Sequence, residues 1–393
     1  MELNIILKLG IILSVLFIAA YVVRRLSSVP SIVVYVILGL LLGAFVDRRS
    51  EAVLDFFSEI GLVLLFFFLG LEFSIERIVS VARKIWAAGV LDLIINFCLG
   101  FFVGYFLHFD ITACIFLGAI TYASSSAIVL KLLTDLKRVA NIETETILGV
   151  LIFEDIVASI LLALLSGIER ESTKEASIIF TVLFTLVKVA FLLGASLLIA
   201  RIFASNLRNL IDKIAEEEFL AVFIIGSIFV LSGFVKFLGI SEAFGAFLAG
   251  LIFAESNRLE PVEKIALPLK DIAIAIFFFS FGVSIEITSD FHNLIVALTF
   301  LFFATFLGKI LSGYIGARLS GLGNTPSLRA GYSMVARGEF SVVLAYAAPR
   351  GLGIHALSGL YILLLAFIGI FSMIYAPNLA RRTASVFRRK PSA

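Results

Sequence analysis

The sequence predicts an all-α membrane protein of about thirteen transmembrane helices, arranged as two inverted repeats of six. Three observations favour this class. Hydrophobic residues make up 61% of the 393 residues and charged residues only 15%, whereas a typical soluble domain has about 25% charged residues. The apolar runs are about 20 residues long, which is enough to cross a hydrocarbon core of about 30 Å as helices. They are also continuous, without the two-residue alternation that the strands of a membrane barrel need.

The apolar segments can be counted along the chain, and the ninth and tenth of them are short and interrupted by glycine. The thirteen segments run over residues 3–23, 30–46, 57–74, 86–107, 111–132, 143–166, 178–203, 216–237, 241–255, 268–285, 292–317, 327–347 and 357–379. The first has no basic leading region and no small-residue cleavage site, so we expect a retained span. Cys98 and Cys114 both fall in apolar segments and indicate neither a disulfide nor a metal site.

The basic residues predict the orientation of these segments. Loops after odd-numbered segments, together with the C-terminal tail, hold 21 of the 31 Lys and Arg residues, and loops after even-numbered segments hold 6. Because basic loops stay on the cytoplasmic side, the N-terminus is expected outside and the C-terminus in the cytoplasm of a cell-membrane protein.

Two pairs of similar stretches indicate an internal duplication. Residues 59–70 align with 271–282, 212 residues later, and residues 31–43 resemble 242–254, 211 residues later. This offset moves the third segment onto the tenth, an odd shift that reverses its orientation. Inverted repeats are typical of secondary transporters. The predicted division is a first repeat (1–177), a connecting span (178–204), an inverted second repeat (205–380) and a short basic cytoplasmic tail (381–393).

Two adjacent acids, Glu154 and Asp155, interrupt the sixth apolar segment. A carboxylate at the bilayer centre costs about 2.5–3.5 kcal/mol on insertion scales, so buried membrane acids usually exist for function. Two ionised neighbours would repel each other, and the pair is therefore expected to hold a proton, a cation or both.

The fifth and twelfth segments hold corresponding places in the two repeats, and both carry residues that weaken a helix. These residues are Thr121, Ser124, Ser125 and Ser126 in the fifth segment and Arg337, Gly338 and Glu339 in the twelfth. Serine competes for backbone hydrogen bonds and glycine adds backbone entropy, so both segments are predicted to be discontinuous and to line a cation site. The alternative is that the serines only allow close helix packing.

Four further ionisable groups lie in or near the apolar segments. Lys309 is deep in the eleventh segment and needs a carboxylate partner or must be neutral. We predict it as a counter-ion near Asp155 that can give way to a bound cation; the alternative is a pair that only locks two helices. Charge balance predicts a structural ion pair of Arg337 with Glu72, Glu339 or both. Asp92 and Glu242 lie near segment ends, so the membrane interface is expected for them.

These features together resemble the monovalent cation:proton antiporter superfamily, in its second branch of NapA-type and Kef-type transporters. The resemblance covers essentially all thirteen segments. Its markers are GLEFS (70–74), TYASSSA (121–127), FED (153–155), SEAFGAFLAG (241–250), GK (308–309) and RGEF (337–340).

The resemblance implies the NhaA-like antiporter fold, with crossed and unwound fifth and twelfth helices. It implies that Asp155 binds cation and proton alternately, that Lys309 is the paired lysine of electrogenic members, and that Glu72 pairs with Arg337. It also implies homodimers that work by an elevator-like movement of a core against a scaffold. Glu154 departs from the Asp, Asn or Gln usual at its position. The long nucleotide-binding regulatory domain of Kef-type relatives is not expected in this chain.

The sequence therefore predicts a Na⁺/H⁺ antiporter rather than an enzyme. Its partners would be Na⁺ (or Li⁺ or K⁺), protons, membrane lipid and a second copy of the chain, with no cofactor, no nucleic acid and no metal beyond the transported cation. Na⁺ is preferred because K⁺-type members usually have Gln before the aspartate. The alternatives are a Kef-type K⁺/H⁺ antiporter without the regulatory domain, a cation channel, or an intramembrane enzyme, for which Asp92 is the only candidate second aspartate.

Overall fold

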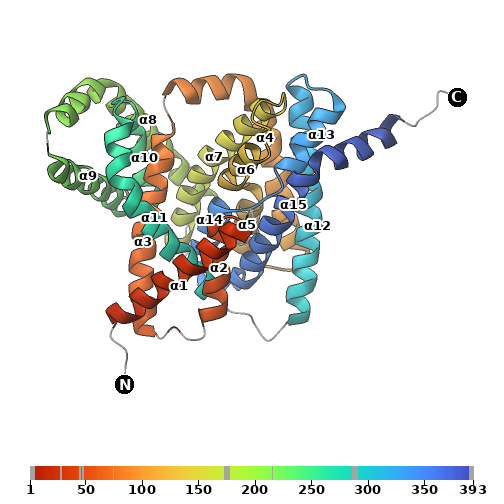
Figure 1. Cartoon of the computed structure of the whole chain (residues 1–393), viewed down its shortest axis with the longest axis horizontal. Helices are drawn as coiled ribbons and strands as arrows, with labels where there is room; N and C mark the ends of the chain where they lie inside the picture. The colour runs from red at the N-terminus through yellow and green to blue at the C-terminus, as the bar shows by residue number, and fades with distance from the viewer. Residues whose placement is uncertain are drawn as a thin grey trace. The chain divides into compact units, whose positions relative to one another are not determined.

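The computed structural model describes residues 5–26, 29–43, 46, 48–73, 75–171, 178–214, 216–285 and 291–388. Within these ranges the chain is helical and has no strand (Figure 1). Ten helical stretches of this described part are long and apolar enough to cross a membrane, and α2 and α10 are shorter apolar helices. The chain is thus a multi-pass membrane protein, while the number of its crossings stays a prediction.

Each apolar segment of the sequence coincides with one helix, except that the fifth and twelfth segments each give two. The helices are α1 (Ile5–Leu26), α2 (Ser31–Leu42), α3 (Arg48–Leu71), α4 (Ile75–Phe106), α5 (Ile111–Tyr122), α6 (Ser126–Asp135), α7 (Thr144–Glu171), α8 (Ile178–Lys213), α9 (Glu217–Phe237), α10 (Glu242–Ala254), α11 (Leu259–Val283), α12 (Phe291–Leu319), α13 (Asn324–Ser333), α14 (Glu339–Tyr346) and α15 (His355–Arg388). Part of the predicted tail is therefore helical. Its residues 389–393, and Ser74 of the GLEFS marker, lie outside the described residues.

One compact unit comprises residues 1–13, 44–80 and 159–280. Its buried centre is α10, which packs against α3, α9 and α8. Glycine permits the close approaches: a Cβ placed on Gly70 of α3 would lie 2.9 Å from the Cα of Gly250 in α10. Glu242, expected at the membrane interface, begins α10 and forms a partly exposed ion pair with Lys236 at 3.1 Å.

The second compact unit comprises residues 14–43, 81–158 and 281–393. In it α12 packs against α13 and α15, and α14 packs against α5 and α15. Here too glycine sets the approach, because a Cβ on Gly313 of α12 would lie 2.7 Å from the Cα of Gly331 in α13. This unit contains both interrupted segments and the charged groups described below.

Candidate cation and proton site

The fifth apolar segment is interrupted where the sequence places its serine cluster. Helix α5 ends at Tyr122, and α6 begins at Ser126. The residues between them are extended, with φ/ψ of −73°/129° at Ala123 and −90°/104° at Ser125. Ser125 caps α6, because its Oγ accepts a hydrogen bond from the Ile128 N–H at 3.2 Å. A serine at this position satisfies one of the free N–H groups of the helix start.

The twelfth segment is interrupted between Ser333, the last residue of α13, and Glu339, the first of α14. The two interruptions meet. The Ser125 N–H donates to the Ala336 carbonyl at 2.8 Å, and the Ser124 hydroxyl donates to the Met334 carbonyl at 2.9 Å. A Cβ on Gly338 would collide with the Ser125 side chain, so the contact requires glycine there. The predicted interruptions are thus present, and each supplies partners for the backbone of the other.

Side chains also satisfy the carbonyl groups at the end of α5. Ser341 of α14 donates to the carbonyls of Ile120 and Ala123, at 2.8 and 3.0 Å. Thr121, predicted to line the site, donates instead to the Asn96 carbonyl of α4 at 3.1 Å. Buried backbone polar groups need such partners. Ser341 therefore holds the interruption to α14, while the Thr121 hydroxyl is 3.1 Å from both the Asn96 carbonyl and the Gly118 carbonyl of its own helix.

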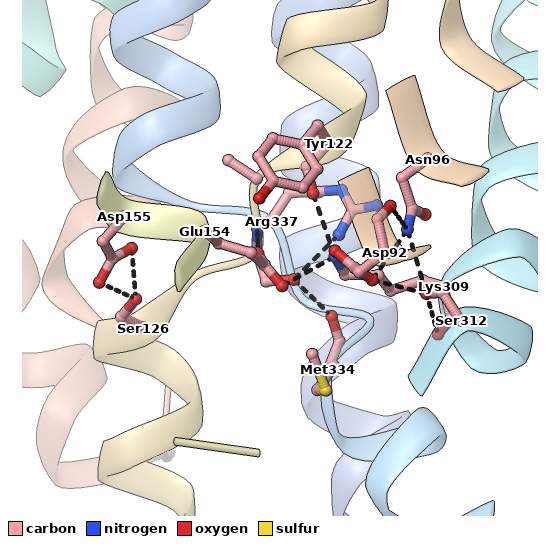
Figure 2. Close-up of polar contacts among 12 residues, drawn as sticks. Asp92, Asn96, Tyr122, Ser126, Glu154, Asp155, Lys309, Ser312, Met334 and Arg337 are labelled. Carbon is pink, nitrogen blue, oxygen red and sulfur yellow. Dashed lines mark hydrogen bonds and ion pairs between the residues drawn. The ribbon is translucent and has the colours of Figure 1, made fainter. Parts of the chain in front are cut away.

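Lys309 of α12 lies next to the interruption and is fully buried. Its ammonium donates to Asp92 Oδ2 at 2.7 Å, to Glu154 Oε1 at 2.9 Å and to the Tyr122 carbonyl at 3.1 Å. The sequence prediction paired Lys309 with Asp155, whereas the structure pairs it with Glu154 and Asp92 (Figure 2). We call Asp92, Glu154 and Lys309 the Lys309 cluster. Its formal charge is −1 when both acids are ionised.

Asp92 corrects an expectation from the sequence, which placed this acid at the membrane interface. It is 1% exposed. The apolar segment starts at residue 86, but α4 begins at Ile75, so Asp92 is well inside the helix. Spacing could have shown its role: Asp92 and Asn96 share one face of α4, and Lys309 and Ser312 share one face of α12. Asn96 and Ser312 both donate to Asp92 Oδ1, at 3.0 and 2.6 Å.

Glu154 and Asp155 are adjacent in α7 but point in different directions, because successive helix residues are about 100° apart. Glu154 is fully buried, and its second oxygen, Oε2, accepts the Ser124 N–H at 2.5 Å. Asp155 is 6% exposed and lies toward α6, where the Ser126 hydroxyl is 2.8 Å from each of its carboxylate oxygens. Figure 2 shows Asp155 and Ser126 apart from the Lys309 cluster. The paired acids thus have separate surroundings.

Arg337 and Glu339 flank Gly338 and have separate partners. Arg337 is fully buried and donates to the Tyr361 hydroxyl at 3.2 Å and to the Ser124 hydroxyl at 3.4 Å. Glu339 accepts from the Ser125 hydroxyl at 2.8 Å and from the Ala127 N–H at 3.1 Å, at the positive end of α6. The predicted pairing of Arg337 with Glu339 is therefore not found. Glu72 belongs to the other compact unit, and its pairing with Arg337 stays a prediction.

A second group of charges, of which Arg138 and Glu143 are buried and Arg329 is partly exposed, lies outside the predicted site. Glu143, fully buried just before α7, accepts from Arg138 at 3.4 Å and from Arg329 of α13 at 3.0 Å. We call these three residues the Arg138 cluster. Burial lowers the pKa of Arg138, and the Glu143 carboxylate opposes that shift. A guanidinium nevertheless stays charged at any physiological pH, so the formal charge of this cluster is +1.

Arg138 also bonds two groups that end or bend a helix. Its Nη1 donates to the Met373 carbonyl of α15 at 2.9 Å, and its Nη2 donates to the Ser333 hydroxyl at the end of α13 at 3.2 Å. Met373 is four residues before Pro377, which lies inside α15 and has no N–H to offer. Arg138 therefore supplies the hydrogen bond that the proline removes.

The arrangement defines a class of protein before any comparison. It is a multi-pass helical membrane protein in which two interrupted helices meet beside buried acids and a buried lysine. Such discontinuous helices and intramembrane charges are features of secondary ion transporters.

Comparisons with known proteins agree. The family described as "Sodium/hydrogen exchanger, transmembrane" matches residues 12–383. The chain belongs to this family, and so to the monovalent cation:proton antiporter superfamily. It is a cation/proton antiporter.

Two relatives match almost the whole chain. The ammonium/H⁺ antiporter subunit AmhT of Alkalihalophilus pseudofirmus is 33% identical over 95% of this chain and 93% of its own length. The K⁺/H⁺ antiporter subunit KhtU of Bacillus subtilis is 33% identical over 99% of this chain and 97% of its own. The solved structure of the sodium proton antiporter MjNhaP1 from Methanocaldococcus jannaschii at pH 8 has the same fold, with a TM-score of 0.69 and 18% identity over 96% of this chain and 98% of that one.

Proposed function

We propose that this antiporter exchanges K⁺ or ammonium for protons, and that the cation and the proton compete for Asp155. The separate surroundings of the two adjacent acids carry the proposal. Glu154 is bonded to a buried ammonium, whereas Asp155 is bonded to a serine hydroxyl at the start of α6. A carboxylate held by a neutral hydroxyl can take up either a proton or a monovalent cation.

Three features would help Asp155 to bind a cation. Ser126 offers a hydroxyl oxygen once its proton turns away from the carboxylate, and hydroxyl and carboxylate oxygens are the ligands of hard cations. Asp155 keeps a small exposed surface of 6%, while Glu154 and Lys309 have none, so Asp155 is the more accessible of the two acids. Glu154 lies on the same turn and would add negative charge whenever its bond to Lys309 loosens.

The sequence prediction and the relatives AmhT and KhtU favour different cations. The sequence favoured Na⁺, and the matching family is described as sodium/hydrogen exchangers. The two relatives at 33% identity are an ammonium/H⁺ and a K⁺/H⁺ antiporter subunit, and they match along nearly the whole chain. We give these relatives more weight, with Na⁺/H⁺ exchange as the second candidate.

One transport experiment tests both parts of the proposal. The purified full chain in proteoliposomes, acid inside, receives K⁺, NH₄⁺, Na⁺ or Li⁺ outside, and internal pH is followed with a trapped dye. K⁺ and NH₄⁺ are expected to drive proton efflux at lower concentrations than Na⁺. Because neutral ammonia crosses lipid unaided, the NH₄⁺ signal is corrected with protein-free liposomes.

The variant Asp155→Asn tests the residue. It keeps the size of the side chain but removes the charge, so cation-driven proton movement is expected to fall to the level of empty liposomes. Asp135→Asn is the matched control, because it makes the same change at an exposed acid at the end of α6. Full transport by Asp155→Asn would exclude Asp155 as the carrier. A non-saturating cation flux without proton movement would favour the channel alternative.

The proposal includes the inverted repeat, and two glycine contacts support it. A Cβ on Gly70 would lie 2.9 Å from the Gly250 Cα, and a Cβ on Gly282 would lie 2.8 Å from the Gly39 Cα. Gly70 and Gly282 are 212 residues apart, and Gly39 and Gly250 are 211 apart, the two offsets of the sequence repeat. Each added Cβ would also collide with the carbonyl three residues before its partner glycine. A duplicated pair of helix crossings accounts for this match.

The mode of movement and the assembly complete the proposal. An elevator needs two bodies that are each compact, and the chain divides into two compact units. The excess of basic residues in alternate loops supports an external N-terminus and a cytoplasmic C-terminus.

We propose a homodimer as well. Since AmhT and KhtU are both named as subunits, we also propose that this chain assembles with a further, different subunit, which affinity purification from its native membrane would capture.

The contacts of Asp92 argue against the alternative of an intramembrane enzyme. Asp92 is buried inside the protein, contrary to its expected place at the interface, and so meets one requirement of an intramembrane aspartyl enzyme. However, its carboxylate is bonded to Lys309, Ser312 and Asn96. Aspartyl chemistry needs two carboxyl groups that share a proton, and these contacts commit Asp92 to other partners.

A further inference from the structure

The carboxylate of Asp92 accepts hydrogen bonds from three side chains. Oδ2 accepts from Lys309 at 2.7 Å, and Oδ1 accepts from Ser312 at 2.6 Å and from Asn96 at 3.0 Å. Asn96 is itself fixed, because its amide also donates to the Asp92 backbone carbonyl at 2.9 Å. Asp92 is 1% exposed. Donors from α4 and α12 therefore hold this carboxylate in one place, away from solvent.

Lys309 divides its three N–H donors among three acceptors. These are the carboxylates of Asp92 and Glu154 and the carbonyl of Tyr122. If Glu154 turns toward a cation near Asp155, the ammonium keeps an anionic partner and a carbonyl. Because the Lys309 cluster has two carboxylates for one ammonium, one carboxylate is available to bind a cation.

We infer that Asp92 is a positioning residue that sets cation affinity by compensating Lys309. This inference rests on the proposed antiport at Asp155 and deepens it. Without the Asp92 charge, the ammonium would oppose an incoming cation through a medium that screens charge poorly. It would also bind Glu154 alone and so withhold that carboxylate from the site. Both effects lower the affinity for the cation, so their signs agree.

The inference predicts that a substitution at Asp92 changes the affinity for the cation rather than the amount of folded protein. Asp92→Asn keeps the size of the side chain and one of its two acceptor oxygens but loses the charge. It is expected to raise the half-saturating cation concentration by roughly 5–150-fold, the usual range for coupled sites, with a smaller change in maximal rate. Asp92→Glu is expected to restore part of the affinity. Ser312→Ala, which keeps the charge but removes one donor, is expected to have a smaller effect than Asp92→Asn.

The test uses transport in proteoliposomes and, on the same purified protein, the rise of melting temperature with added K⁺ or Na⁺, since a bound ligand stabilises the folded state. Lys309→Gln and the double variant Asp92→Asn/Lys309→Gln complete a cycle. If Asp92 acts through Lys309, the shift caused by Asp92→Asn disappears when Lys309 is absent. The melting assay reports binding even for a variant that does not turn over.

Three outcomes would overturn the inference. Asp92→Asn could reduce yield and melting temperature while leaving the half-saturating concentration unchanged, which is a purely structural role. It could shift affinity equally in the Lys309→Gln background, which is an effect independent of the lysine. Asp92→Glu could fail to restore affinity although Asp92→Asn lowers it. The proposed function fails separately, when the wild-type protein shows no cation-driven proton movement or Asp155→Asn keeps it.

Discussion

The Lys309 cluster and the Arg138 cluster are both triads of charges in the same compact unit, but their balance is opposite. The Lys309 cluster is buried throughout, whereas the Arg329 side chain of the Arg138 cluster is 26% exposed. The Lys309 cluster has one cation and two anions; the Arg138 cluster has two cations and one anion. Burial makes both expensive unless every charge is paired. Anions are in excess in the Lys309 cluster and cations in the Arg138 cluster. The sign of this excess determines what each cluster can do.

In the Lys309 cluster the ammonium has two anionic partners. The ammonium bonds two carboxylates on different helices, Asp92 of α4 and Glu154 of α7, so one can leave while the other stays. In the Arg138 cluster the guanidinium also bonds a backbone carbonyl and a serine hydroxyl, neither of which carries charge to exchange. The first arrangement suits ion exchange, and the second suits a clamp that holds α13 and α15 to the loop before α7.

The strongest test of this comparison is Lys309→Gln. Removing the ammonium leaves two buried acids without their cation, a change that typically costs about 3–5 kcal/mol of stability. Transport per folded molecule is expected to be lost, because the ammonium that alternates with the bound cation as the partner of Glu154 is gone. Proteoliposome transport, normalised to the monodisperse protein recovered, measures this. Normal transport by the variant would show that the cluster is only structural.

The counterpart is Arg138→Ala. Its stability cost is expected to be similar, about 3–5 kcal/mol, because Glu143 loses one partner and the Met373 carbonyl is left without a donor. Transport per folded molecule is nevertheless expected to persist. The melting temperature in detergent and normalised transport give the two readouts, with the exposed Arg381→Ala as control. A variant that melts like the wild type but fails to transport would reverse the roles assigned to the two clusters.

Much of the fold could be predicted from the sequence. Long apolar runs correspond to helices, and the serines at 124–126 and Gly338 correspond to the two interruptions. Both are local properties of the chain. The adjacent acids were recognised too, because any charge in an apolar run stands out.

The partners of these charges could not be predicted, because they depend on packing. Asp92 was placed at the interface because it lies near the start of its apolar segment. The position of that boundary does not show which helices pack against Asp92. Asp155 was paired with Lys309, although the neighbouring Glu154 holds that place, and only the rotation of α7 decides between them. Arg138 entered only the count of basic loop residues, since the Ser333 and Met373 groups that it bonds are 195 and 235 residues away.

The smallest expected effect concerns Pro377 and isolates one bond of the Arg138 cluster. Pro377→Ala restores an N–H that can donate to the Met373 carbonyl within α15, the bond that Arg138 replaces in the wild type. Loss of Arg138 should therefore cost less in the Pro377→Ala background, by about the net value of one hydrogen bond, roughly 0.5–1.5 kcal/mol.

A double-mutant cycle of melting or denaturant midpoints for the wild type, Arg138→Ala, Pro377→Ala and the double variant measures this coupling. A coupling of zero would mean that the carbonyl finds another donor when Arg138 is absent, so the clamp would act through Glu143 and Ser333. A double variant that loses less stability than the sum of the two single variants would instead tie the α6–α7 loop to α15 at Pro377. Pro377 belongs to the surroundings of the Arg138 cluster and not of the Lys309 cluster. Pro377→Ala should therefore leave the cation affinity of the transport site unchanged. The substitution thus separates the two clusters, because it affects only one of them.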